Sequence, residues 1–126
     1  MTNRDSALLA LRPTVATHPD GELPAEAFQN QVLRPVLKLQ NPLLINHFRA
    51  YLRAHGVAEK FELMPEVARR EYVRTTLQKD VVLRQQLAGM VLGQFTEAEY
   101  DAYAADARAN QKRLVAMLTQ RLQTQG

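Results

Sequence analysis

Residues 81–100, VVLRQQLAGMVLGQFTEAEY, carry the strongest structural signal of the chain. The first part of this stretch is apolar on nearly every side of a helix, which is typical of the central helix of a bundle. A clear boundary follows it. Thr96 is an N-cap candidate, Glu99 stands three residues later with the spacing of a capping box, and Phe95 and Tyr100 occupy the positions of a hydrophobic staple. The stretch predicts that one helix ends and another begins near Thr96.

The C-terminal part of the chain continues as one predicted helix from Glu97 toward Gln123. Acidic residues fall in its first turns and basic residues in its later turns, which is the polarity that complements a helix dipole. Its apolar positions recur at helical spacing and predict an inner stripe. The stripe comprises Tyr100, Tyr103, Ala107, Leu114, Met117, Leu118 and Leu122.

Upstream, the helical period begins at Pro24, since Phe28, Val32, Val36 and Leu39 recur at spacings of four, four and three. We expect a kink at Pro35, because proline lacks the amide donor and its ring crowds the preceding turn. Asn41-Pro42 has the pattern of a cap followed by a first-turn proline and predicts the start of a second helix. Gly56 suits the end of that helix.

Three further segments complete the predicted architecture. A connector around 61–64 leads to Pro65 and a third helix. Whether 65–95 form one helix or two stays open, because Asp80 suits an N-cap while nothing forbids a continuous helix. We expect residues 1–23 to form an arm and a loop, with Leu8, Leu9 and Leu11 packing the arm onto the body and Pro13 ending any helix in it.

The fold class that follows is all-α. We expect a single domain over residues 1–126, a compact orthogonal or up-down bundle of about five helices with an N-terminal arm. The chain of 126 residues is 46% hydrophobic and 23% charged, and its net charge is +3. It has no apolar stretch long enough for a membrane span and no export-signal pattern, so we expect a cytoplasmic protein.

Catalytic and metal chemistry find little support in the residues. The chain has no cysteine and three histidines, His18, His47 and His55, without a convergent set of carboxylates at ligand spacing. Its only serine, Ser6, lacks the surroundings of a nucleophile. The sequence therefore favours a non-enzymatic protein with no catalytic residues, no metal and no cofactor.

Gly89 and Gly93 form a smooth strip, with Ala88 beside them, inside a helical pattern. Each glycine costs a helix about 1 kcal/mol relative to alanine, so the strip needs a compensating contact. Two explanations remain open: tight packing within the monomer, or a partner helix or ligand that lies over the strip.

Polar side chains among the apolar helices suggest a second kind of site. An interhelical pocket lined by Tyr51, Tyr72, Tyr100 or Tyr103 would accept a small molecule. Its polar contacts would be Arg34, His47 or Arg84. Amides in 28–48 would either line such a pocket or bond carbonyl groups freed by the prolines.

The basic residues of the middle of the chain suggest a third possibility, a phosphate-contacting face. It would comprise Arg49, Arg53, Arg69, Arg70 and Arg74. Acidic residues are mixed into the same helix and aromatic residues are few, so we expect nucleic acid not to be a principal partner.

The segments FQNQVLRPVLKLQNPLLINHF (28–48) and QKDVVLRQQLAGMVLGQFTEAEYDAY (78–103) resemble those of short bacterial proteins without an established function, some of which carry the label glyoxalase. The resemblance implies a compact helical domain. Glyoxalase-type enzymes are built from strand-rich modules with metal-binding His and Glu, and this chain has neither, so no site residue is carried over.

Taken together, the residues predict a protein-interaction or self-associating helical domain, with Gly89 and Gly93 at the interface. The alternatives are a small-molecule protein that uses Arg34, His47, Tyr51, Arg84 and Tyr100, or a weak nucleic-acid binder. We expect a homodimer or a protein partner, and no membrane.

Overall fold

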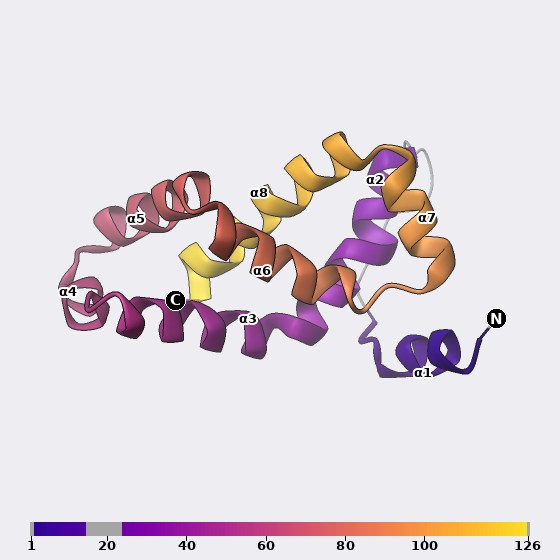
Figure 1. Cartoon of the computed structure of the whole chain (residues 1–126), viewed down its shortest axis with the longest axis horizontal. Coiled ribbons are helices and arrows are strands. Elements are labelled where there is room, and N and C mark those ends of the chain that lie inside the picture. Colours follow the sequence, from indigo (N-terminus) through magenta and orange to yellow (C-terminus); the bar gives the residue numbers. More distant parts are fainter. Residues whose placement is uncertain (1, 15–23, 126) are drawn as a thin grey trace.

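The computed structural model describes residues 2–14 and 24–125, and these are helical with short connections (Figure 1). No strand occurs within the described ranges, so the predicted all-α class is confirmed. The loop expected at 17–21 lies outside them. The helical segments are α1 (Asn3–Leu11), α2 (Pro24–Phe28), a π-helical turn η1 (Gln29–Leu33), α3 (Arg34–Ala54), α4 (Ala58–Leu63), α5 (Glu66–Lys79), α6 (Val81–Leu92), α7 (Glu97–Ala105) and α8 (Ala107–Gln125). The described residues are thus divided into more segments than the five expected.

The helix from α2 through η1 to α3 is uninterrupted, although its direction changes along its length (Figure 1). Pro35 stands in the first turn of α3 directly after the wide π turn, in which the N–H of Arg34 donates to the carbonyl of Gln29. The wider turn relieves the clash that the ring of Pro35 would make in a regular helix. The predicted helix start at Asn41-Pro42 is wrong, because Pro42 lies inside α3. Packing of the α3 core face outweighs the hydrogen bond that Pro42 cannot donate.

The end of α3 is as predicted. Gly56 follows the last turn with a φ of 68°, a conformation that glycine adopts without strain. The expected connector around 61–64 is instead partly helical, as α4. Burial explains the difference, since Phe61 is buried and packs edge-on against Phe48, with ring centroids 5.9 Å apart.

Asp80 separates α5 from α6 and settles the alternative that the sequence left open. Its carboxylate accepts a hydrogen bond of 3.0 Å from the backbone N–H of Leu83. The backbone at Asp80 is extended rather than helical. Two helices therefore replace one continuous helix over 65–95, and Asp80 is the N-cap of the second.

The predicted capping box at the start of α7 is confirmed, since Thr96 and Glu99 exchange both hydrogen bonds. The single helix predicted from Glu97 to Gln123 is wrong. It breaks at Asp106, where φ is −141° and ψ is 60°. The buried side chain of Asn110 donates a 3.0 Å hydrogen bond to the carbonyl of Tyr103, which at this helix end also accepts a 3.3 Å bond from the N–H of Asp106.

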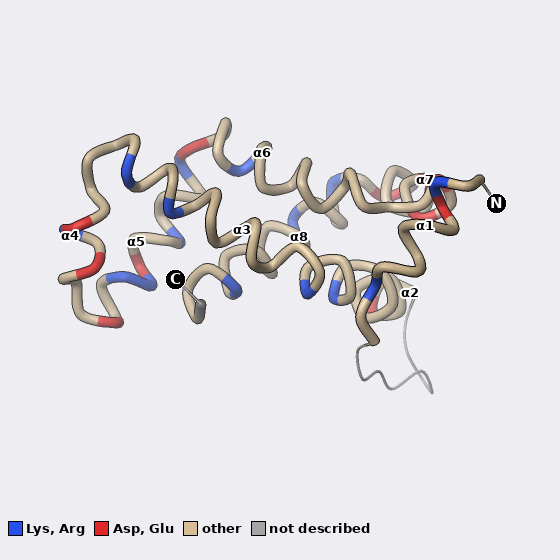
Figure 2. The backbone as a smooth tube through the Cα atoms, turned by 90° about the horizontal axis from the view of Figure 1, so that it is seen from below, with Lys and Arg blue, Asp and Glu red and all other residues tan. Residues whose placement is uncertain are grey.

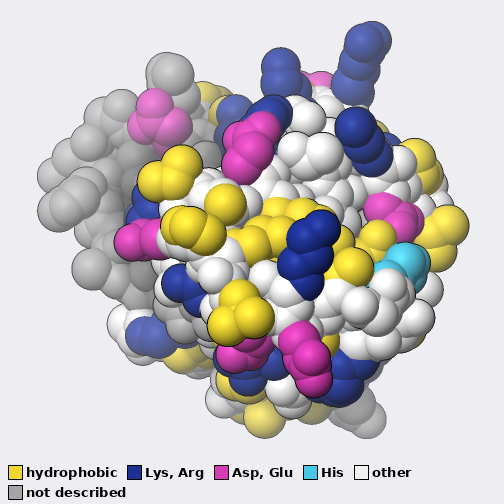
Figure 3. Space-filling view, turned by 90° about the vertical axis from the view of Figure 1, so that its left-hand side faces the viewer, with side chains coloured by type: hydrophobic (Ala, Val, Ile, Leu, Met, Phe, Trp, Pro, Cys, Tyr) yellow, Lys and Arg dark blue, Asp and Glu magenta, His cyan; other side chains and the backbone are white. Residues whose placement is uncertain are grey.

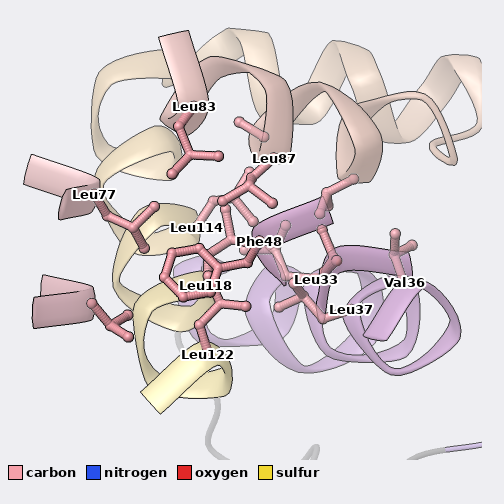
Figure 4. Close-up of a cluster of buried hydrophobic side chains, with 14 of the residues drawn as sticks. Leu33, Val36, Leu37, Phe48, Leu77, Leu83, Leu87, Leu114, Leu118 and Leu122 are labelled. Carbon is pink, nitrogen blue, oxygen red and sulfur yellow. The ribbon is translucent and has the colours of Figure 1, made fainter. Parts of the chain in front are cut away.

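The core is built where α3, α6 and α8 pack on one another and α5 packs on α6 and α8. Leucines from each of these helices converge around Phe48 (Figure 4). Of the predicted inner stripe, Tyr103, Leu114, Leu118 and Leu122 are buried, whereas Tyr100 and Ala107 are exposed because the break at Asp106 turns α7 away from the axis of α8.

The N-terminal arm is held differently from the prediction. Leu9 and Leu11 are 40% and 62% exposed and Leu8 is half-buried, so leucine packing holds α1 less than expected. Polar contacts hold it as well. Arg4 donates hydrogen bonds to carbonyls at the end of α6, Asp5 accepts one from the first N–H of α7, and Arg12 forms an ion pair with a glutamate of α7. The apolar character of the arm did not reveal these contacts, because their partners lie more than 80 residues away in the chain.

Candidate interaction surface

The outward side of α6 is uncharged along its length. Val82, Gln86, Gly89 and Gly93 recur at spacings of four, three and four, which places them on one side of the helix, and each is exposed. The sequence predicted the central helix of the bundle, apolar on nearly every side. The structure buries only its inward residues, among them Leu83, Leu87 and Val91. The α6 face, as we call the side that carries Val82, Gln86, Gly89 and Gly93, is therefore an open surface.

A shallow hollow of about 710 Å³ lies between the α6 face and α3. Its lining combines backbone of Gly89, apolar parts of Leu43 and Met90, and the polar side chains of Asn46, His47 and Gln86. Leu43 is 53% exposed. The hollow is thus mainly apolar, and it lies open to a partner.

Two side-chain bridges hold α3 and α6 together beside this hollow. Nε2 of His47 lies 2.8 Å from Oε1 of Gln86, and Nε2 of Gln40 donates a 2.8 Å hydrogen bond to the carbonyl of Met90. Three polar side chains in this region therefore cross-link the helices. Of the amides in 28–48, Gln40 serves as a tie here and Asn46 lines the hollow.

The surroundings of the glycines exclude one of the two explanations that the sequence left open. A Cβ placed on Gly89 would meet no atom within 4 Å, so tight packing within the monomer does not account for this glycine. A Cβ on Gly93 would come 3.2 Å from the backbone oxygen of Gly89. The carbonyl of Gly93 accepts a 3.0 Å hydrogen bond from Arg4. Gly93 thus joins the α6 face to the docked arm.

The five predicted ligand-binding residues do not share one pocket. Arg34 is exposed and donates to Asn30, and Arg84 donates to the carbonyls of Leu77 and Gln78 at the end of α5. The remaining three residues, His47, Tyr51 and Tyr100, line three separate hollows. The interhelical pocket expected from the sequence is therefore not assembled from these side chains.

Tyr51 has the most constrained environment of these residues. Its hydroxyl donates a 2.8 Å hydrogen bond to Asp80 and its ring stacks on Phe48, 6.2 Å between centroids. Burial and the bond to Asp80 raise the pKa of Tyr51 to about 12. The N–H of Leu83 and the Tyr51 hydroxyl lower the pKa of Asp80. The pair braces the α5–α6 junction against α3, beside a hollow of about 470 Å³.

Two of the five residues of the predicted basic face form ion pairs. Arg70 pairs with Glu66 at 2.8 Å, and Arg74 pairs with Glu71. Both pairs lie along α5, where the acidic residues alternate with the basic ones. These two arginines therefore contribute little unpaired positive charge. The ion pairs of the described residues include none of the other three, Arg49, Arg53 and Arg69.

A partly buried ion pair between Arg12 and Glu99 is the main polar feature that sequence reasoning missed. Burial acts to raise the pKa of Glu99, but hydrogen bonds from Arg12 and from the N–H of Thr96 outweigh it and hold that pKa below its usual value. Glu99 thus closes the capping box and anchors the arm at once.

Hydrophobic side chains are also exposed at the end of the molecule formed by α4 and α5, where Leu63 and Val67 are 85% and 81% exposed. Charged side chains of both signs stand among them (Figure 3). This mixture contrasts with the uncharged α6 face and makes the α4–α5 end a useful control surface.

Within residues 2–14 and 24–125, no group of three or more His, Asp or Glu side chains is arranged to hold a metal ion. No helix in the same ranges is both long and apolar enough to cross a membrane. Comparison with family models, with curated proteins and with solved structures gives no match.

Proposed function

We propose that the protein is a non-catalytic interaction domain that associates with a second copy of itself through the α6 face. The observation that carries the proposal is the open space around Gly89 on an uncharged, exposed helix side. A glycine inside a helix lowers its stability by about 1 kcal/mol, and nothing within the monomer uses the space that it leaves.

A second α6 helix fits this surface sterically. Small residues at spacings of about four let two helix backbones approach closely. In a twofold-symmetric pair the same face meets itself, so Gly89 of each copy would lie against α6 of the other. Val82 of the α6 face and Leu43, which lines the hollow, would supply apolar contact area on burial.

The chemistry of the surface agrees with a self-complementary contact. Uncharged residues along α6 avoid the repulsion that two like-charged faces would suffer at a twofold axis. The amides Gln86 and Asn46 at the hollow provide polar groups for its rim.

The test is the molar mass in solution by light scattering over a wide range of protein concentration. We expect a monomer–dimer equilibrium that Val82→Glu shifts to monomer, because each dimer would then bury two facing carboxylates. Val67→Glu makes the same chemical change at the α4–α5 end and serves as the matched control. A wild-type protein that stays monomeric at high concentration, or equal effects of both variants, would contradict the proposal.

A small-molecule site is the alternative, and the hollow beside Tyr51, Lys79 and Asp80 is its best location. Native mass spectrometry of the purified protein distinguishes the two functions. A monomer that retains a small molecule supports the pocket, and a ligand-free dimer supports self-association.

A further inference from the structure

Two neighbouring helices of this fold contain no acidic residue. α3 carries Arg34, Lys38, Arg49 and Arg53, and α8 carries Arg108, Lys112, Arg113 and Arg121, without any Asp or Glu in either. Acidic positions gather instead around α4 and α5 at one end and around α1 and α7 at the other (Figure 2). The charge of the molecule is therefore divided by region, although its net value is small.

Four of these cations can be assigned to the seam between α3 and α8, Arg121 and Arg34 from their interactions and Lys38 and Arg113 from helical spacing. Arg34 and Lys38 are one helical turn apart on α3, and Asn41 stands on the same side. Arg113 and Arg121 are two turns apart on α8. Nη1 of Arg121 donates a 3.2 Å hydrogen bond to Oδ1 of Asn41, which joins the two rows across the seam. We call Arg34, Lys38, Arg113 and Arg121 the seam cations.

The described part of the chain supplies no counter-charge to the seam cations. Among the side chains described, none of the four lies within ion-pair distance of a carboxylate, unlike Arg70 and Arg74 on α5. Partial burial, and after it the positive charge of Arg34, lowers the pKa of Arg121. The structure thus holds a repulsion between like charges that a bound anion would relieve.

The chemistry of the seam favours phosphate over a protein surface. The only large apolar side chain of α3 or α8 that is strongly exposed is Leu43, and it lines the hollow toward α6. The seam therefore lacks the apolar centre of a protein interface or a membrane anchor. Guanidinium groups match phosphate oxygens in geometry, and amides such as Asn30 and Asn41 are common phosphate neighbours.

We propose that the seam cations bind the phosphodiester backbone of a nucleic acid without reading its sequence. The seam has no exposed aromatic ring for base stacking, so contact is with the backbone of a duplex. This site shares no residue with the basic face predicted from the sequence, and it lies on the side of α3 away from the α6 face. It does not depend on self-association.

The test is fluorescence anisotropy of the full chain with a labelled 20-base-pair DNA duplex and with an RNA duplex of equal length. Four phosphate contacts predict a slope of log K against log salt of about −3.6, which is roughly a 100-fold loss of affinity between 50 and 200 mM salt. Arg34→Gln with Lys38→Gln should bring the slope to about −1.8 and weaken binding at least tenfold. Tighter binding of the DNA duplex or of the RNA duplex identifies which nucleic acid is the natural partner.

The matched control is Arg70→Gln with Arg74→Gln, which removes the same charge from α5. We expect it to leave the slope and the affinity nearly unchanged. Three outcomes would overturn the proposal: no binding of either duplex at 50 mM salt, equal weakening by the control pair, or binding of poly-glutamate or of phosphatidylserine vesicles as tight as that of the duplexes. Circular dichroism of each variant verifies the helical fold.

Discussion

The α6 face and the seam cations border α3 from opposite sides, the first through α6 and the second through α8, and they differ in nearly every physical property. The α6 face is uncharged, small and close to the backbone, whereas the seam is basic, long-chained and polar. The first suits close contact between helices and the second suits an anionic polymer. The comparison shows that one amphipathic helix supports two unlike surfaces when its two flanks meet different neighbours, α6 and α8.

The largest expected effect comes from destabilising α3, the helix that both surfaces border. Phe48 is buried at the centre of the core and packs against Phe61 and Tyr51. Phe48→Ala should lower the free energy of unfolding by about 3–5 kcal/mol, because it deletes a large buried ring and leaves a cavity. Urea denaturation measures this loss. If the variant unfolds the α5 end and spares both surfaces, α3 is not their common support.

A smaller effect is expected at the docked arm, which touches the end of the α6 face. Glu99→Gln should cost about 1–3 kcal/mol at pH 7, since it removes the charge that pairs with Arg12. Because the pKa of Glu99 is held below its usual value, its stabilising effect is present above the unfolded pKa of about 4.5 and is lost as pH falls through the lower folded value.

Denaturation of wild type and Glu99→Gln across pH 3 to 7 checks the direction of this pH dependence. The two stability curves should converge at low pH, where the wild-type carboxylate is also neutral. Parallel curves would show that Glu99 acts through capping geometry rather than through charge.

Gly89→Ala sharpens the contrast between the surfaces in a single substitution. We expect it to raise the stability of the monomer by about 1 kcal/mol, since the new methyl group meets no neighbour and alanine is the better helix former. The same methyl group should weaken dimerisation and leave duplex binding at the seam unchanged. A destabilised monomer would mean that Gly89 is packed, contrary to the structure.

The smallest effect belongs to the neutralised basic residues of α5. Arg70→Ala removes an exposed pair with Glu66 and should change stability by only about 0.3–0.5 kcal/mol. Self-association and duplex binding should both persist. A strong loss of duplex binding would indicate that the nucleic acid binds at α5 and not at the seam.

Local features of the sequence were sufficient for much of the fold. The capping box at Thr96 and the helix end at Gly56 depend on residues within one turn of each other, so spacing and backbone preference predict them. Proline preferences were less informative, because Pro42 remains inside α3 where core packing outweighs its missing donor. For the candidate surface, the position of Gly89 inside a helical pattern singled it out, but the sequence did not predict that it is exposed.

The sequence by itself determined that the chain is helical, which segments are apolar, and where the strongest caps lie, because these depend on neighbours within a few residues. Only the tertiary structure decided that Asp106 breaks the last helix, that Arg12 anchors the arm to Glu99, and which flank of α3 carries charge. Each of these depends on contacts between distant segments, and helical periodicity gives the side of a helix but not the neighbour that covers it.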